Sequence, residues 1–331
     1  MTLAQDVFRT LADGGVHSGE ALAERAGVTR SAVWKAIEQL RGMGLEIAAQ
    51  THRGYQLVAA CEALDAQRIH AGLAPSIRHS ATVDVEWEIE STNGALLSAV
   101  PPQPGRFVVL LAENQTGGRG RRGRAWQSAL GSSLCLSIAT SFEPLPRDLP
   151  ALTLVIGVCV REALQRRGAH DLGLKWPNDI VTPLMEKLGG ILVELRAEAG
   201  GPGHVVIGVG LNLRLSADAK QAIAETGTLA EDLAAQGVET GARNTLAAEI
   251  IGCCIEGLTR FAHEGFTPFI AAWRSADALR DQPIRVLEGS VEREGIARGI
   301  DQHGALQLET TSGQHVALIG GEVSVRREGL R

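Results

Sequence analysis

The chain has few aromatic residues and few cysteines, and both shortages limit what it can be. Aromatic side chains make up 4% of the 331 residues, so a hydrophobic core must be built mainly from Leu, Ile, Val and Ala. The cysteines are odd in number, form no Cys-x-x-Cys pair and mostly lie in apolar runs: Cys61, Cys135, Cys159, Cys253 and Cys254. We therefore expect reduced, buried thiols and neither a disulfide framework nor a zinc site.

Long hydrophobic runs and a secretory leader are also missing. The longest apolar stretch, near Leu152 to Val160, is shorter than the roughly 20 residues that span a bilayer. The first residues, MTLAQDVFRTL, lack a basic region followed by a long apolar stretch. We expect a cytoplasmic protein without a membrane partner. The formal net charge of −6 also means that any nucleic-acid site must be a local basic patch.

Residues 1–63 are predicted to form a winged helix-turn-helix domain. Ser18 and Thr29 can cap two short helices that follow an apolar helix at 4–12, and residues 45–57 alternate as a strand pair. The second capped helix would enter the major groove of DNA. Its outer side and the hairpin tip supply the expected DNA-binding residues: Thr29, Arg30, Ser31, Trp34, Lys35 and Arg53. DNA binding is a hypothesis here, because this fold also serves in protein–protein interaction.

The rest of the chain divides into a long mixed segment and a short β-rich one. Residues 64–281 alternate strand and helix patterns, which predicts an α+β domain with a mixed sheet and helices packed against it. Residues 282–331 contain short strands separated by glycine turns, which predicts a small SH3-like β-barrel.

The strongest chemical signal is an arginine- and glycine-rich loop at residues 117–124, directly after a predicted buried strand. Forked arginine donors suit phosphate or carboxylate oxygens, and glycine permits close backbone approach. The loop matches Gly-x-Gly-x-x-Gly at Gly118, Gly120 and Gly123, but neither an apolar helix nor an acidic ribose partner follows. We therefore reject a dinucleotide site. RNA binding is disfavoured because the tract is single and short.

Two further segments place polar groups where predicted strands end. Lys175, in the run Lys-Trp-Pro-Asn-Asp, can stabilise negative charge on a phosphoryl oxygen, although alone it could equally be a surface lysine. The run Glu90 to Asn93 can cap a helix or hydrogen-bond a small polar ring. No phosphate loop of the Walker type exists, since Gly-Lys never occurs in the sequence.

Together these motifs resemble the biotin–protein ligases, and specifically the bacterial proteins that are both ligase and biotin operon repressor (the BirA type). The resemblance covers essentially the whole chain. It rests on Ser91–Asn93, Gln115, Gly118–Gly123, Lys175–Asp179, Lys187–Glu194, Gly208–Asn212 and Gly320–Arg326.

The resemblance implies an ATP-dependent ligase with two half-reactions. The biotin carboxylate attacks the α-phosphate of ATP to give biotinyl-5′-AMP, and a lysine of biotin carboxyl carrier protein, a subunit of acetyl-CoA carboxylase, then attacks this anhydride. ATP and biotin are substrates, Mg²⁺ assists at the phosphates, and no residue is assigned as a metal ligand. The implied catalytic residues are Lys175, Arg119 and Arg121.

The resemblance also assigns the binding residues. Those implied for biotin are Ser91, Thr92, Asn93, Gln115, Arg119, Gly120, Arg121 and Lys175. Those implied for the nucleotide are Arg121, Lys175, Asn178, Lys187, Asn212 and Arg326. Asp179 is a candidate base for the acceptor lysine, with turn capping as the competing role.

Regulation follows from the same resemblance, with biotin operon DNA as a second partner and a homodimer linked to the bound ligand. The sequence departs from repressor-type relatives because no aromatic residue occurs from 213 to 260, where such a side chain can cover the adenine. Three alternatives stay open: a ligase whose N-terminal domain does not regulate, a biotin-sensing DNA-binding regulator without catalysis, and a lipoate or octanoyl transferase. The arginine loop and the two flanking domains disfavour the last. The operator sequence and the oligomeric state are left open.

Overall fold

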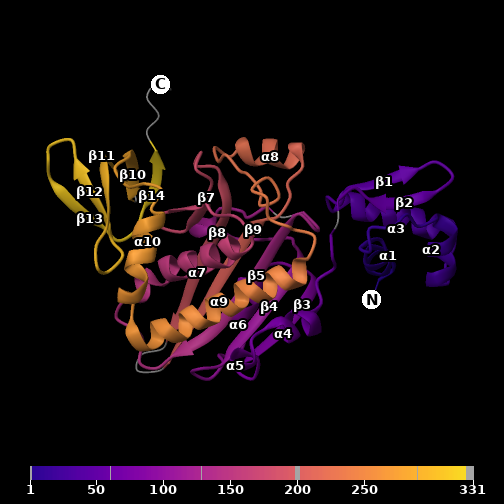
Figure 1. The fold of residues 1–331 in the computed structure, drawn as a ribbon, viewed down its shortest axis with the longest axis horizontal. Coiled ribbons are helices and arrows are strands. Elements are labelled where there is room, and N and C mark those ends of the chain that lie inside the picture. The colour runs from indigo at the N-terminus through magenta and orange to yellow at the C-terminus, as the bar shows by residue number, and fades with distance from the viewer. Residues whose placement is uncertain (1, 60, 128, 198–201, 289, 326–331) are drawn as a thin grey trace.

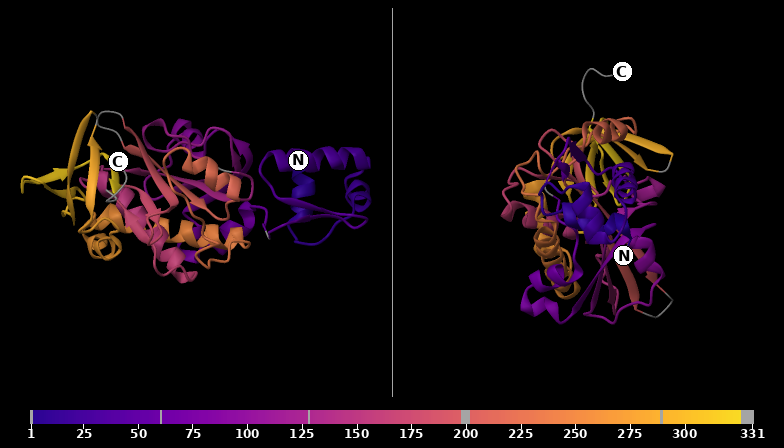
Figure 2. Two further views of the ribbon diagram at one scale, coloured as in Figure 1. Left: turned by 90° about the horizontal axis from the view of Figure 1, so that it is seen from above. Right: turned by 90° about the vertical axis from the view of Figure 1, so that its right-hand side faces the viewer.

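The structure, a computed structural model, describes residues 2–59, 61–127, 129–197, 202–288 and 290–325. Its three parts follow one another along the long axis, with the N-terminal helices at one end and the C-terminal sheet at the other (Figures 1 and 2). Within the described residues, no helix is both long and apolar enough to cross a membrane.

The N-terminal part has the predicted winged helix-turn-helix order. It comprises α1 (Leu3–Leu11), α2 (Gly19–Ala26), α3 (Arg30–Gly42), β1 (Ile47–Gln50) and β2 (Gly54–Leu57). Each helix begins at a hydroxyl residue, Thr2, Ser18 or Thr29, whose side chain accepts a backbone N–H bond from the first turn. Between α2 and α3, Gly27 adopts a left-handed backbone with φ of 63°. Local capping and turn chemistry therefore explain why this segment could be predicted.

The central part is built on one seven-stranded mixed sheet in the order β3-β4-β5-β9-β8-β7-β6. Only the β3–β4 pair is parallel among the paired strands of this sheet. The strands are β3 (Ala81–Ile89), β4 (Phe107–Gln115), β5 (Ser133–Phe142), β6 (Gly173–Lys175), β7 (Asp179–Val181), β8 (Lys187–Ala197) and β9 (Gly203–Asn212). The predicted mixed sheet is confirmed.

Helices cover the two faces of this sheet unequally. The long helices α7 (Leu152–Arg166) and α9 (Arg243–Glu264) pack on one face and bury the largest apolar cluster (Figure 1). The short helix α6 (Thr92–Ser98) lies on the other face against a smaller cluster. The remaining helices are α4 (Ala66–Gly72), α5 (Pro75–Arg78), α8 (Ala217–Ala224) and α10 (Ile270–Ala276).

The C-terminal part is a five-stranded antiparallel sheet in the order β13-β12-β11-β10-β14. Its strands are β10 (Pro283–Glu288), β11 (Val291–Ile300), β12 (Leu306–Thr310), β13 (His315–Leu318) and β14 (Glu322–Val325). Within the described ranges β13 and β14 do not pair, so the predicted barrel is not closed there. The indole N–H of Trp176 donates to the carbonyl of Gly304 at 3.0 Å and joins this sheet to the central part.

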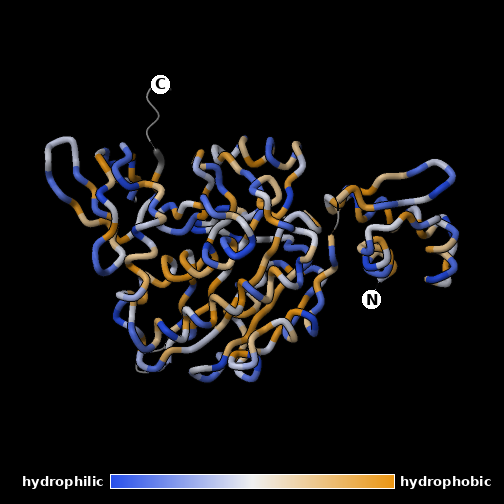
Figure 3. The backbone as a smooth tube through the Cα atoms, viewed as in Figure 1, coloured by the Kyte–Doolittle hydropathy of each residue, from blue (hydrophilic) through white to orange (hydrophobic). Residues whose placement is uncertain are grey.

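Apolar residues gather in the central sheet and its long helices, whereas hydrophilic residues dominate the outer loops (Figure 3). The C-terminal sheet shares the main core through Ile284, Val286 and Leu318. The N-terminal part has a separate core. All five cysteines are buried, as predicted.

Candidate active site

A cavity of about 830 Å³ lies where the central sheet, the segment around α8 and the C-terminal sheet meet. The structure brings together there all but one of the residues expected to bind biotin or nucleotide: Ser91, Thr92, Asn93, Gln115, Arg119, Gly120, Arg121, Lys175, Asn178, Lys187 and Asn212. Arg326 lies outside the described residues. Residues as far apart in the sequence as Ser91 and Asn212, 121 positions, therefore line the same cavity.

One end of the cavity is a buried network of neutral polar groups at the start of α6. The backbone N–H and hydroxyl of Thr92 both donate to the side-chain oxygen of Gln115, at 2.8 and 3.1 Å. The Ser137 hydroxyl lies 2.7 Å from Thr92 Oγ1 and donates to Asn93 Oδ1 at 2.6 Å, while Asn93 Nδ2 donates to the Glu194 carboxylate at 2.8 Å. A network in which each member has partners specifies one arrangement. Neither Ser137 nor Glu194 is among the binding residues predicted from the sequence, although Glu194 ends the Lys187–Glu194 motif.

Two glycines on β9 leave room for this end of the site. A Cβ on Gly208 would lie 2.4 Å from Asn93 Oδ1, and one on Gly210 would lie 2.6 Å from the indole of Trp126. Both distances are far below van der Waals contact, so a side chain at either position would displace Asn93 or Trp126. Packing against Asn93 and Trp126 thus explains why glycine occupies positions 208 and 210 of this strand.

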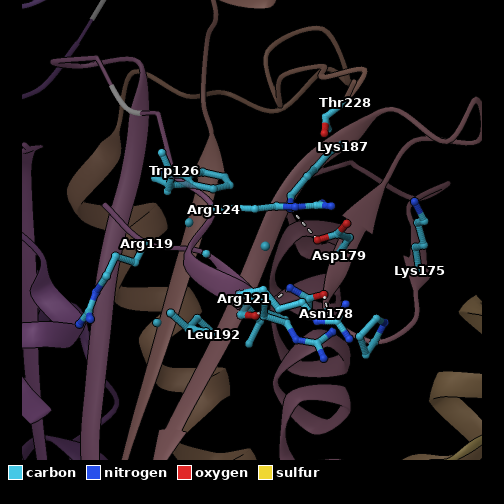
Figure 4. Close-up of a pocket in the computed structure, with 18 of the residues that line it drawn as sticks. Arg119, Arg121, Arg124, Trp126, Lys175, Asn178, Asp179, Lys187, Leu192 and Thr228 are labelled. Atoms are coloured by element: carbon cyan, nitrogen blue, oxygen red, sulfur yellow. Dashed lines mark hydrogen bonds and ion pairs between the residues drawn. The ribbon is translucent and has the colours of Figure 1, made fainter. Parts of the chain in front are cut away.

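The other end of the cavity is cationic (Figure 4). Arg121 Nη1 lies 3.4 Å from Asn178 Oδ1 and 3.5 Å from the carbonyl of Gly321. Lys187 pairs with Asp179 at 2.7 Å. In the part of the chain that the structure describes, the Lys175 ammonium has no ion pair. Burial lowers the pKa of Lys175, as do the nearby charges of Lys187 and Arg124, while Asp179 opposes this.

Arg119 lies beside the network of hydroxyl and amide groups rather than at the cationic end. Its guanidinium lies 3.9 Å from the Glu194 carboxylate, and Figure 4 shows it directed away from Arg121 and Asn178. The three expected catalytic cations, Arg119, Arg121 and Lys175, therefore line one cavity at different places.

The arginine loop itself is a short hairpin. Gly120 N–H donates to the carbonyl of Arg124 at 2.7 Å, and Trp126 N–H donates to the carbonyl of Gly118 at 2.8 Å. Arg122 adopts a left-handed backbone with φ of 57° at its tip. Glu322 of the C-terminal sheet accepts a hydrogen bond from Arg124 and lies 3.8 Å from Arg122. This contact joins positions far apart in the chain, so local sequence patterns carry no signal for it.

The segment after β9 lines the cavity without any aromatic residue, as the sequence requires. Its lining residues are Ile223, Thr226, Gly227, Thr228, Leu229 and Ala230. Among the described residues that line the cavity, the aromatic side chains are Trp126 and Trp176. The Lys187 ammonium lies 5.8 Å from the centre of the Trp126 ring. Trp126 is not among the predicted binding residues, although it follows the arginine loop and is one of five tryptophans.

Asn212 and Asn178 each use amide N–H groups to fix the cavity wall. Asn212 Nδ2 donates to the carbonyls of Lys187 at 3.2 Å and Glu231 at 3.1 Å. Asn178 Nδ2 donates to the carbonyl of Ile191 at 3.1 Å. The side-chain oxygen of Asn212 remains as the acceptor that a ligand could use.

A second candidate site is the outer face of α3. Thr29, Arg30, Ser31 and Lys35 are exposed there, and Trp34 keeps 54% of its surface exposed. Arg53 is exposed at the tip of the β1–β2 hairpin. All six residues are thus exposed, five at α3 and one at the hairpin tip.

The sequence matches three protein-family models. Residues 89–212 match the biotin/lipoate A/B protein ligase family, residues 4–56 match the HTH domain, and residues 281–326 match the biotin protein ligase C-terminal domain.

Individual relatives are similar over nearly the full length. The chain is 39% identical to the bifunctional ligase/repressor BirA of Salmonella typhimurium, over 98% of this chain and 98% of that protein. Identity to the bifunctional ligase/repressor BirA of Escherichia coli is 35%, with the same coverage. Among solved structures, the biotin protein ligase from Aquifex aeolicus in complex with biotin and ATP superposes with a TM-score of 0.62 and 25% identity, over 74% of this chain and 99% of that one.

Proposed function

The chain belongs to the family of bifunctional biotin–protein ligases and repressors, and we infer that it attaches biotin to a lysine of an acceptor protein with ATP. The resemblance drawn from its motifs is thereby confirmed. The observation that carries the inference is the cavity itself, which joins a neutral hydrogen-bonding end to a cationic end. Such a site suits a ligand with a polar, uncharged head whose carboxylate must meet a phosphate.

The neutral end suits the ureido ring of biotin. A ureido group offers two N–H donors and one carbonyl acceptor, and Ser91, Thr92, Asn93 and Gln115 supply hydroxyl and amide partners on a rigid network. Gly208 lets the Asn93 amide pack against β9, because a Cβ there would lie 2.4 Å from Asn93 Oδ1. We assign biotin to this end, with the Arg119 guanidinium and the backbone of Gly120 beside it.

The cationic end suits the first half-reaction. The biotin carboxylate and the α-phosphate are both anionic, so their approach needs fixed positive charge in a site with little water. Arg121 and Lys175 would supply it. A carboxylate oxygen forms a bond to the α-phosphorus, the bond to the β-phosphate oxygen breaks, and pyrophosphate leaves. Asn178, Lys187 and Asn212 would contact the nucleotide, and Arg326 stays a predicted contact.

The second half-reaction needs no covalent enzyme intermediate. The neutral amine of the acceptor lysine attacks the acyl carbon of biotinyl-5′-AMP, AMP leaves, and one proton is released. We propose biotin carboxyl carrier protein as the acceptor. The Asp179 carboxylate is engaged with Lys187 at 2.7 Å, which favours a role in holding that lysine over a role as base.

Mg²⁺ would assist at the phosphates. No group of three or more His, Cys, Asp or Glu side chains among the described residues could hold a metal ion. The donor set therefore fits an ion held mainly by phosphate oxygens, as Mg²⁺ commonly is, with Asp179 as the nearby protein carboxylate. When bound with ATP, the ion would neutralise charge on the phosphate chain.

The N-terminal part gives the protein its second activity, repression through DNA binding. The exposed face of α3 carries Arg30 and Lys35 for phosphates and Trp34 for base edges. Two such domains in a ligand-linked homodimer would match a two-fold operator of the biotin genes. We place the protein in the cytoplasm, where ATP, the carrier protein and DNA are all accessible.

Biotin-dependent exchange of pyrophosphate into ATP tests the proposed ligase chemistry. We expect exchange by the full chain and its loss, by at least about a hundredfold, in Lys175→Ala. Lys220→Ala is a matched control, because Lys220 pairs with Glu231 and Asp232 outside the cavity lining. Biotin binding without exchange in the unmodified protein would instead support a sensor that does not catalyse.

A further inference from the structure

A short segment of the central part is buried in the core of the N-terminal domain. Leu130 is fully buried within the N-terminal apolar cluster, together with Phe8 and Leu40. Its backbone N–H donates to the carbonyl of Met43, just after α3, at 2.9 Å. Leu130 therefore belongs to one domain by sequence and to the other by packing.

The neighbouring residues hold this insertion tightly. A Cβ on Gly44 would lie 2.5 Å from the Cβ of Ala129, and Gly44 has a φ of 93° that favours glycine. A Cβ on Gly131 would lie 2.7 Å from the Sγ of Cys61, in the segment that joins the two domains. Small residues on both sides of the contact thus permit Leu130 to enter.

The same segment continues the arginine loop of the active site. Trp126 and Gln127 line the cavity, and Trp126 N–H closes the loop hairpin on Gly118. Leu130 follows Trp126 by four positions, a span of at most about 14 Å. Beyond it, the carbonyl of Ser132 accepts a bond from Leu213 N–H at 2.8 Å, next to the cavity residue Asn212. Leu130 therefore lies between the cavity residue Gln127 and Ser132, whose partner Leu213 directly follows a cavity residue.

Strand β3 also connects the N-terminal domain to the cavity. Trp87 on β3 packs against Phe8 of α1, with ring centres 5.8 Å apart. Four positions later, Ser91 lines the cavity at the start of α6. The N-terminal domain thus contacts Trp87 and Leu130, each of which lies four positions from a cavity residue, Ser91 or Trp126.

We propose that Leu130 is a positioning residue that couples ligand binding in the cavity to docking of the DNA-binding domain. With Leu130 seated, the end of the arginine loop is fixed to α3 as well as to the central sheet. Ligand held against the cavity residues Trp126 and Gln127 then stabilises the docked domain, and by linkage the docked domain raises ligand affinity to the same extent. The proposal rests on the proposed ligase function for the identity of its ligands.

Truncation of the side chain should release the loop without removing any cavity residue. In the full-length protein, we expect Leu130→Ala to raise KM for biotin and for ATP about tenfold, with kcat changed less than about threefold. A tenfold change corresponds to about 1.4 kcal/mol. Loss of a catalytic group would lower kcat instead.

Tryptic cleavage supplies an independent readout, because residues 119–124 contain four arginines. With biotin and ATP present, we expect cleavage in this loop to be about tenfold faster in Leu130→Ala than in the unmodified protein. Leu130→Met should restore protection, since it keeps the volume. Leu22→Ala is the matched truncation, because Leu22 lies in the same core but on α2, far from the central part (Figure 1). It should leave loop cleavage unchanged.

Gly44→Ala disturbs the contact from the other domain and tests the proposal if Leu130→Ala folds poorly. The added methyl should displace Ala129, and KM and loop cleavage should rise in the same direction. Values for Leu130→Ala and Gly44→Ala equal to those of the unmodified protein, in a preparation whose ligase activity is intact, would overturn the coupling. An inactive unmodified protein would instead overturn the proposed function.

Discussion

Glu113 and Arg243 form a buried ion pair beneath the segment that joins the N-terminal and central parts. The side chains are 4% and 0% exposed, and their charged atoms lie 2.6 Å apart. Glu113 also accepts the Leu64 N–H at 2.6 Å, and Arg243 donates to the Glu62 carbonyl at 3.1 Å. Burial acts to lower the pKa of Arg243, but the Glu113 carboxylate outweighs it and raises that pKa above its ordinary value. The pair therefore fixes the linker.

Glu113→Gln preserves shape but leaves the guanidinium without a counter-charge in the interior. Removing one partner of a buried pair costs about 3–5 kcal/mol, a large part of the roughly 5–15 kcal/mol that stabilises a typical domain. The double variant Glu113→Leu with Arg243→Met removes both charges, so we expect it to cost less than Glu113→Gln alone. The loss of the acceptor for Leu64 N–H, about 1–3 kcal/mol, would remain in it.

Urea unfolding of the full chain at pH 7, followed by circular dichroism, measures these costs. The partly exposed pair of Arg167 and Glu249, with side chains 23% and 37% exposed, is the control. Glu249→Gln should cost no more than about 1 kcal/mol. A cost of Glu113→Gln as small as that of Glu249→Gln would show that the buried pair does not stabilise the fold. A double variant that loses as much stability as Glu113→Leu and Arg243→Met lose in sum would show the same.

Three further predictions concern the cavity and the DNA face. Because the pKa of Lys175 is lowered, this lysine loses its charge at a lower pH than an ordinary lysine does. Pyrophosphate exchange should fall as the pH rises through that pKa. In Lys175→Arg the fall should come only at higher pH, because arginine keeps its charge. An identical pH profile in both proteins would contradict this. Gly208→Ala places a methyl group 2.4 Å from Asn93 Oδ1. KM for biotin should therefore rise at least about tenfold, while KM for ATP stays nearly constant. Equal changes in the two KM values would speak against a biotin site beside Asn93. Lys35→Ala should weaken operator binding and reduce its logarithmic salt dependence by about 1 in a filter or fluorescence assay, whereas Trp34→Ala should lower affinity for the operator more than for random DNA.

The parts of the fold that could be predicted are those set by local chemistry. Thr29 caps α3 because a hydroxyl residue precedes an apolar helical stripe, and this pattern is visible without the rest of the chain. The sheet order is different, because the parallel β3–β4 pair and the antiparallel β9 next to β5 depend on contacts between distant segments. The open C-terminal sheet likewise depends on which edge strands meet.

The candidate site divides in the same way. Lys175 and the arginine loop stand out because charged side chains at strand ends, within a glycine-rich run, have few structural explanations. Local periodicity does not predict three other contacts: Glu194 with Asn93, Glu322 with Arg124, and Leu130 with the N-terminal core. Each is defined by a partner that only the folded chain brings close.

The proposed activity is the ATP-dependent coupling of biotin to an acceptor lysine. It is tested most directly by incubating the full-length chain with labelled biotin and a purified biotin carboxyl carrier domain, with and without ATP. We expect label on one lysine of the carrier, only when ATP is present, and none in Lys175→Ala. Label that appears without ATP, or no label although biotin binds, would contradict the claim.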